Sequence, residues 1–152
     1  IGKDADFEWI FYGWDGVEAE RRGIALNYIP LKEIDPVFDY YTPVIISSED
    51  YLAKNPQTSK KFMTALKKGY EYCIAKPDSA ADILLKNVPE LNPEQVKRSM
   101  QYLAKEYKSD ALVWGIQNPV VWKRFCEWMY QQRLIQLAVD PDKAYSNEFL
   151  PQ

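Results

Sequence analysis

Two aromatic side chains and two carboxylates lie close together in the stretch YGWDGVE, residues 12–18. Tyr12 and Trp14 offer flat faces that can stack against a heteroaromatic ring. Asp15 and Glu18 offer acceptors for ring N–H or exocyclic amino groups, and a hydrogen bond to an ionised carboxylate is stronger than one between neutral groups. These residue types at this spacing predict a recognition site for a small, nitrogen-containing aromatic compound.

The same stretch also fits a purely structural interpretation. Asp15 as an N-cap, with Glu18 three residues later, forms a capping box that satisfies the first backbone N–H groups of a helix without any ligand. Aromatic residues on a buried strand usually belong to a hydrophobic core. Gly13 and Gly16 suit both interpretations, because a glycine lets a ligand or another element approach the backbone closely. The residue types alone leave both interpretations open.

Composition excludes several classes of function. The chain of 152 residues has a formal net charge of −3 and contains no histidine, so nothing favours nucleic acid, an anionic membrane surface or a histidine metal site. The acids Glu33, Asp35 and Asp39 lack the spacing of a calcium-binding loop and are interpreted as solvated loop residues. No phosphate-binding loop, serine nucleophile motif or apolar run of membrane-spanning length is visible. We therefore expect no metal and no cofactor.

The two cysteines, Cys73 and Cys126, fall at apolar positions of predicted helices. We interpret them as buried free thiols, with a disulfide between the two helices as the alternative. Their number says little about the redox environment of the protein.

Three short apolar runs in the first third of the chain predict strands: FEWIFY at residues 7–12, IALNYIPL at 24–31 and YTPVIIS at 41–47. A helix over about residues 15–22, ended by Gly23, separates the first two runs. A strand–helix–strand unit implies parallel pairing, as in an α/β sheet.

In such a sheet, ligands bind in the crevice at the carboxyl ends of the strands. Residues 12–18 occupy this position for the first predicted strand. Tyr41, which begins the third run, could reach the same crevice or simply mark the edge of a strand, and the sequence favours neither.

From residue 48 onward the apolar pattern is helical. Three helix starts place a capping asparagine before a proline, and a fourth helix begins at another proline: Asn55-Pro56, Asn92-Pro93, Asn118-Pro119 and Pro77. Each of these helices carries apolar residues at 3.6-residue spacing, so each packs one face inward. The sequence therefore predicts a helix-rich α/β fold, with a short strand–helix–strand unit followed by about four amphipathic helices.

Three stretches together resemble the C-terminal half of a solute-binding protein of an ABC importer: DFEWIFYGWDGVEAERRGI, DYYTPVIISSEDYLAKNP and KFMTALKKGYEYCIAKPDSAADILLKNVPEL. The resemblance extends over about residues 4–135. The helix pair in the third stretch is typical of the superfamily, which includes sulfonate, nitrate and riboflavin binders. The motif GWDGVEAE resembles the corresponding segment in the branch of the superfamily that binds thiamine pyrimidine precursors.

This resemblance implies part of a two-lobed, type II periplasmic-binding-protein fold, whose lobes close on the ligand by a hinge motion. Residues 1–40 would end the second lobe, and residues 41–152 would return to the first lobe through a crossover strand and the C-terminal helices. The aromatic and acidic residues of 12–18, together with Tyr41, would then contact the ligand.

The resemblance implies a binding protein and not an enzyme. It would capture a small heteroaromatic compound, by preference a thiamine pyrimidine precursor, and deliver it to an ABC permease from an extracytoplasmic location, in the periplasm or as a cell-surface lipoprotein. Members of that superfamily are about twice this length, so we expect the N-terminal half to be absent, with weak ligand binding and self-association through exposed apolar surface. A pyrimidine-synthase-like enzyme and a ligand-sensing regulatory domain are alternatives with the same architecture.

Overall fold

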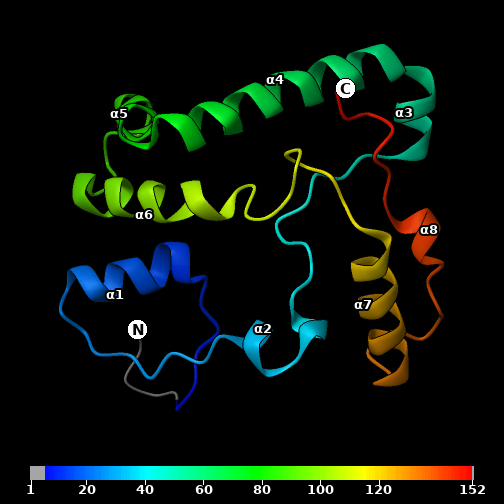
Figure 1. Ribbon diagram of the computed structural model, residues 1–152, viewed down its shortest axis with the longest axis horizontal. Coiled ribbons are helices and arrows are strands. Elements are labelled where there is room, and N and C mark those ends of the chain that lie inside the picture. The colour runs from blue at the N-terminus through cyan, green and yellow to red at the C-terminus, as the bar shows by residue number, and fades with distance from the viewer. Residues whose placement is uncertain (1–5, 152) are drawn as a thin grey trace. The chain divides into compact units, whose positions relative to one another are not determined.

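The computed structural model describes residues 6–151, which form helices joined by irregular segments (Figure 1). Two compact units divide the chain, and each is assembled from separate stretches of sequence. The first unit holds residues up to Asn27 together with Lys68–Trp114, and the second holds Tyr28–Lys67 together with the residues from Gly115 onward. The long helix α4 (Pro56–Ala75) contributes to both. Within residues 6–151, no helix is long and apolar enough to cross a membrane.

The first unit is built around a helix pair, α5 (Pro77–Asn87) and α6 (Pro93–Glu106), which pack against each other. Small side chains allow a close approach, since Ala80 and Ala81 of α5 are both buried. Burial of apolar side chains is the main favourable term in folding, so this interface anchors the unit. Its other buried apolar residues are Val17, Ala19, Val96 and Trp114.

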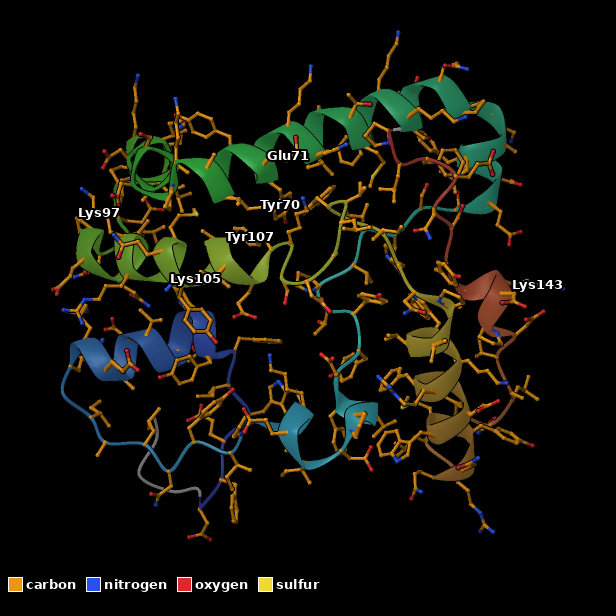
Figure 2. All side chains as sticks on the ribbon, viewed as in Figure 1. Tyr70, Glu71, Lys97, Lys105, Tyr107 and Lys143 are labelled. Atoms are coloured by element: carbon orange, nitrogen blue, oxygen red, sulfur yellow. The ribbon has the colours of Figure 1, made fainter. Side chains whose placement is uncertain are left out.

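An aromatic cluster joins the C-terminal part of α4 to the segment that follows α6. The ring of Tyr70 stacks on that of Trp114, with centroids 4.5 Å apart and planes at 22°. Tyr107 meets Tyr70 edge-on at 4.9 Å, and Figure 2 shows these two tyrosines between α4 and α6. Because Trp114 is buried, the cluster holds the last turns of α4 in the first unit.

The helix predicted over about residues 15–22 is present as α1 (Val17–Arg21). Gly23 ends it, as predicted, in the left-handed region with a φ of 69°. The N–H of Gly23 donates to the carbonyl of Glu20 at 3.0 Å, and the N–H of the next residue donates to the carbonyl of Ala19 at 2.8 Å. This is the Schellman pattern, in which a left-handed glycine lets the chain satisfy the last helical carbonyls.

The second unit centres on α7 (Pro119–Gln131), which gathers aromatic rings from the segment around residue 40. Phe38 meets Trp128 edge-on at 5.4 Å, and Tyr40 stacks on Phe125 at 4.3 Å. Ring packing of this kind therefore holds the segment on α7. The short helices of the unit are α2 (Leu31–Ile34), η2 (Pro36–Phe38), α3 (Glu49–Lys54) and α8 (Pro141–Ala144).

Two side chains fasten the C-terminal segment to the start of α7. Tyr145 stacks on Trp122, with centroids 5.6 Å apart and ring planes at 7°. Asn147 forms reciprocal hydrogen bonds with the backbone of Gln117, accepting from its N–H at 3.0 Å and donating to its carbonyl at 2.9 Å. The segment is therefore part of the packed second unit.

The predicted strands require a correction, because none of the runs 7–12, 24–31 and 41–47 forms a strand in the described part of the chain. The first run ends in a helical turn at Tyr12, and Leu31 begins α2. A strand exists only when a neighbouring strand pairs with its backbone groups, and these runs do not pair with one another. The helix-rich character of the fold is confirmed, whereas the strand–helix–strand unit is not.

The four predicted amphipathic helices begin at the predicted prolines as α4, α5, α6 and α7. Asn92 and Asn118 cap their helices, because each side-chain oxygen accepts from a backbone N–H of the first turn. Asn55 does not act as predicted, since its side-chain amide donates to the carbonyl of Tyr51 at 3.2 Å. The reason is that α3 ends directly before α4, so an unsatisfied carbonyl lies nearer than an unsatisfied N–H.

Both cysteines are free thiols, as interpreted from the sequence. Cys126 is buried in the second unit, and Cys73 is half-buried in the first. Burial raises the pKa of both thiols, which keeps them protonated and unreactive at neutral pH.

Replacing Asn92 by Ala is expected to lower the free energy of unfolding by about 1 kcal/mol, because the first turn of α6 loses an N-cap acceptor. Asn55→Ala is the matched control: Asn55 also precedes a proline but does not cap the next helix, so its loss should be clearly smaller. Urea unfolding followed by far-UV circular dichroism measures both. Equal losses in the two variants would contradict these assignments.

Candidate functional site

The candidate site is one turn of π-helix, η1 (Tyr12–Gly16), which leads directly into α1 (Figure 1). Asp15 forms hydrogen bonds to Phe11 through both its backbone and its side chain. Its N–H donates to the carbonyl of Phe11 at 2.9 Å, and its Oδ2 accepts from the N–H of Phe11 at 3.0 Å. The predicted N-cap role of Asp15 is therefore wrong. Because the helical turn already starts at Tyr12, Phe11 is the N-cap and the carboxylate reaches back to it.

Gly13 and Gly16 are required by close packing. The carbonyl of Gly13 accepts from the hydroxyl of Ser99 on α6 at 2.5 Å, in a buried position. A Cβ at Gly13 would lie 2.5 Å from Cδ2 of Leu103, and a Cβ at Gly16 would lie 2.5 Å from Cδ2 of the Tyr12 ring. The turn therefore packs directly on α6, with no room for a side chain at either glycine.

Tyr12 supports the turn from the inside. Its ring centroid lies 5.4 Å from that of Tyr102 on α6, with planes at 44°, and its hydroxyl donates a short hydrogen bond to Oε1 of Glu20. The same ring covers Gly16. Tyr12 is half-buried by these contacts, so it positions the turn and offers less stacking surface than Trp14.

Trp14 is the outward-facing aromatic residue of the turn, with 37% of its surface exposed. Its backbone N–H donates to the carbonyl of Phe11 at 3.0 Å, which fixes the residue at its base. A flat indole on a fixed turn can stack against a planar ring at a low cost in conformational entropy.

Glu18 is engaged by two arginines of its own helical segment. Its carboxylate accepts from Nε and Nη2 of Arg21, both at 2.7 Å, and from Nε of Arg22 at 2.5 Å. The hydrogen bonds from Arg21 are the main reason why its pKa falls from the usual 4.5 to about 2; desolvation opposes this shift and Arg22 reinforces it. Glu18 is therefore ionised throughout the neutral range.

The same charges connect α1 to α6. Nη1 of Arg21 lies 4.0 Å from Oε2 of Glu94, and Oε1 of Glu94 lies 2.6 Å from Nη2 of Arg98. Glu94 and Arg98 are about half exposed, so water screens these pairs and each contributes little alone. The network therefore helps to orient the end of α1 and contributes little to the stability of the first unit.

The fifth candidate residue, Tyr41, belongs to the second unit. Its hydroxyl accepts from the backbone N–H of Asn118 at 2.8 Å, and its ring centroid lies 6.4 Å from that of Trp122. The structure therefore brings Tyr12, Trp14, Asp15 and Glu18 onto one continuous helical segment and gives Tyr41 a structural role at the start of α7. The ligand contacts of all five residues stay a prediction.

Sequence reasoning missed the residues of α6 that support the turn: Ser99, Tyr102 and Leu103. Ser99 lies 86 residues after Gly13, and no local pattern signals such a contact. Arg21 and Arg22 do carry a signal, because residues three and four positions after Glu18 are its neighbours on a helix. Among residues 6–151, no three His, Cys, Asp or Glu side chains are grouped so that they could hold a metal ion.

The family model described as NMT1/THI5 like matches residues 1–80, more than half of the chain, and this range includes the turn and α1. The chain belongs to the NMT1/THI5-like family. This membership confirms the superfamily that the sequence resembles.

Three relatives illustrate the NMT1/THI5-like family. The riboflavin-binding protein RibY of Chloroflexus aurantiacus is 28% identical over 89% of this chain and 39% of its own length. A formylaminopyrimidine-binding protein of Halalkalibacterium halodurans is 26% identical over 72% of this chain and 34% of its own length. The 4-amino-5-hydroxymethyl-2-methylpyrimidine phosphate synthase THI5 of Saccharomyces cerevisiae is 28% identical over 73% of this chain and 31% of its own length. The chain thus spans between 31% and 39% of the length of these relatives.

Replacing Gly16 by Ala is expected to lower the free energy of unfolding by about 1–3 kcal/mol, because the added methyl group displaces the Tyr12 ring. Gly69→Ala in α4 is the control: no atom lies within 4 Å of the new Cβ, so it should stabilise by up to about 1 kcal/mol, as helix propensity predicts. Urea unfolding compares the two variants. If Gly16→Ala were as stable as Gly69→Ala, the close packing of the turn would be disproved.

The Glu18 carboxylate should contribute less stability as the solution is acidified. Its pKa in the folded chain, about 2, lies below the usual 4.5, so the stabilisation is fully present above pH 4.5 and is lost as the pH falls toward 2. The difference in free energy of unfolding between the unchanged chain and Glu18→Gln should therefore be constant near neutral pH and shrink over this interval. Urea unfolding at a series of pH values measures it, and a difference that is independent of pH would contradict the Arg21 and Arg22 contacts.

Proposed function

We propose that this chain is part of a solute-binding protein of an ABC importer, which captures a small heteroaromatic compound outside the cytoplasm. A thiamine pyrimidine precursor is the ligand we favour. The main support is the exposed indole of Trp14, which lies on a turn that two hydrogen bonds between Asp15 and Phe11 hold in place. Two relatives are named for binding riboflavin and formylaminopyrimidine, and both compounds are flat nitrogen heterocycles.

Asp15 supplies a directional acceptor next to this stacking surface. Its Oδ2 closes the turn, whereas Oδ1 accepts no hydrogen bond from another described residue. An ionised carboxylate can accept from about four directions, so a ligand amino or ring N–H group would form a charge-assisted bond here. A ligand that lacks such a donor would leave this oxygen without a partner, which gives selectivity for aminopyrimidine-like edges.

Glu18 has a smaller share in recognition. Three guanidinium N–H groups from Arg21 and Arg22 take up most of its acceptor capacity. Residues 12–22 carry three acids and two arginines, so this segment has a net charge of −1 and suits a neutral or cationic ligand with hydrogen-bond donors. We therefore assign stacking to Trp14, the directional bond to Asp15, and support of the turn to Tyr12 and Glu18.

The wider parts of the proposal are supported by family membership and by the resemblance of the sequence. They are part of a type II periplasmic-binding-protein fold, in which residues 1–40 end the second lobe and residues 41–152 return to the first, an ABC permease as partner, and a periplasmic or lipoprotein location. Tyr41 stays a candidate ligand contact.

A pyrimidine-synthase-like enzyme is the second candidate, because the yeast relative is named a 4-amino-5-hydroxymethyl-2-methylpyrimidine phosphate synthase. The chain contains no histidine, and no residue of the turn is arranged as an activated nucleophile. Ligand binding without chemical change supports the binding protein, whereas release of a pyrimidine phosphate would support the enzyme.

Trp14→Ala and Asp15→Asn should each weaken the binding of 4-amino-5-hydroxymethyl-2-methylpyrimidine about tenfold or more. The first removes a stacking surface worth roughly 1–3 kcal/mol per ring, and the second removes a charge-assisted bond worth roughly 1.5–3 kcal/mol. Asp15→Asn should leave the turn intact, because the amide oxygen can still accept from Phe11 while the amino group replaces the free acceptor. Ligand titrations up to millimolar concentration, followed by the five indole signals in ¹H–¹⁵N spectra, measure both affinities.

Tyr130→Ala is the control, since Tyr130 is a 49% exposed aromatic residue of the second unit and its removal should not change the affinity. Riboflavin and taurine in parallel test the ligand class. An affinity unchanged by both Trp14→Ala and Asp15→Asn would place the ligand elsewhere, and a failure of all three compounds to bind would reject the proposed class.

A further inference from the structure

The hydroxyl of Ser99 bonds across an interface, although Ser99 lies inside a helix. A serine in a helix can donate to the carbonyl four residues earlier in the same helix, as Ser59 of α4 does to Asn55 at 3.0 Å. Ser99 of α6 is 3% exposed and donates instead to the carbonyl of Gly13 in η1. Its hydroxyl therefore serves the contact between α6 and the turn.

The carbonyl that Ser99 bonds belongs to the peptide group directly before Trp14. The N–H of this peptide group donates to the carbonyl of Phe11 at 3.0 Å, so the group is held at both ends. The peptide group after Trp14 is held in the same way. Its N–H, from Asp15, donates to the carbonyl of Phe11 at 2.9 Å, and its oxygen accepts from the N–H of Val17. The backbone on both sides of the indole is therefore fixed.

The bond from Ser99 differs from the other three in joining the turn to another element. The other three connect residues of the same short segment, 11–17, so they hold its shape without tying it to α6. Tyr102 and Leu103 of α6 also pack on the turn, but apolar contact of this kind has little directional preference. The hydrogen bond from Ser99 therefore sets the direction of the peptide group before Trp14.

Helix α6 is a firm support for this bond because α5 packs on its other side (Figure 1). Lys97 and Gln101 lie two positions before and after Ser99, which places both roughly on the opposite side of the helix. Nζ of Lys97 lies 3.1 Å from Oδ1 of Asp82, and Nε2 of Gln101 donates to Oδ1 of Asp78 at 2.8 Å. One side of α6 thus meets α5, and the side with Ser99 meets the turn.

We propose that Ser99 is the positioning residue of the candidate ligand site. By holding the peptide group before Trp14, it fixes the direction of the indole and of the neighbouring Asp15 carboxylate before a ligand arrives. This inference rests on the proposed function, because it concerns the same two ligand contacts. A ligand that meets groups already in place does not have to order them, which increases its affinity. Ser99 is buried, so it acts through the turn and does not contact the ligand itself.

Ser99→Ala tests this role by removing the hydroxyl alone, and alanine suits the interior of α6. The variant should bind 4-amino-5-hydroxymethyl-2-methylpyrimidine roughly threefold to tenfold more weakly, because the ligand must then order the turn itself. Ser59→Ala is the matched control: Ser59 is also buried and donates to a backbone carbonyl, but it lies in the second unit. Its loss should leave the affinity unchanged. Titrations followed in ¹H–¹⁵N spectra measure the affinities, and far-UV circular dichroism checks that both variants fold.

Amide hydrogen exchange measures the same role without a ligand. In Ser99→Ala the N–H of Trp14 should exchange roughly threefold to tenfold faster, because its peptide group has lost a buried hydrogen bond. The N–H of Val96, which donates to the carbonyl of Asn92 in the first turn of α6, is the internal reference. A general loss of stability would accelerate both amides alike, whereas loss of positioning accelerates Trp14 more than Val96.

The two measurements separate this inference from the proposed function. Suppose that the unchanged chain binds the pyrimidine and Trp14→Ala weakens binding: if Ser99→Ala then binds as tightly as the unchanged chain, Ser99 is not a positioning residue and the proposed function stands. If no heteroaromatic compound binds the unchanged chain, the proposed function fails, and the exchange rates still decide whether Ser99 orients the turn. Equal rates of Trp14 exchange in the variant and the unchanged chain, or equal acceleration of Trp14 and Val96, would overturn the inference.

Discussion

The packing of one glycine-containing turn on α6 is the contact on which the candidate site depends. The Ser99 hydroxyl donates to the carbonyl of Gly13 in a buried position, and the loss of such a bond would leave desolvated polar groups unpaired. The two glycines leave no gap between the turn and the groups that pack on it. Trp14 is exposed, whereas Gly13 and Gly16 of the same turn are buried. Tertiary contact, more than local helix propensity, therefore decides which aromatic residue of the turn is exposed.

Asp15 and Glu18 are equivalent acids in the sequence and differ sharply in the structure. Asp15 uses one oxygen to hold the backbone of Phe11, which fixes the carboxylate in place, and its second oxygen accepts no hydrogen bond from the other residues of 6–151. Glu18 accepts from three guanidinium N–H groups, and this engagement lowers its pKa to about 2. A carboxylate recognises a ligand through the lone pairs that the protein leaves unused. The two acids therefore differ in the availability of their acceptors, more than in their charge.

The helices could be predicted from the sequence because their signals are local. Proline at the first position, an asparagine cap and an apolar stripe identify α6 and α7, and Gly23 marks the end of α1. The residues of the candidate turn could also be found, because their chemistry lies within seven consecutive positions. Its support by Ser99 could not, since that contact joins positions 86 residues apart. Strand prediction failed for a related reason. The composition of an apolar run indicates only that it could form a strand, whereas a strand also needs a neighbouring strand, which the run itself does not specify.

That failure carries information about the aromatic segment 7–11. Its composition suits a strand with covered rings, yet Trp9 is 62% exposed and the backbone of Glu8 and Ile10 is unpaired within the described chain. Burial of such rings is favourable by about 25 cal/mol per Å² of apolar surface, so any contact that covers them gains free energy. Phe11 connects this segment to the candidate turn, because its ring is exposed and its backbone holds Asp15.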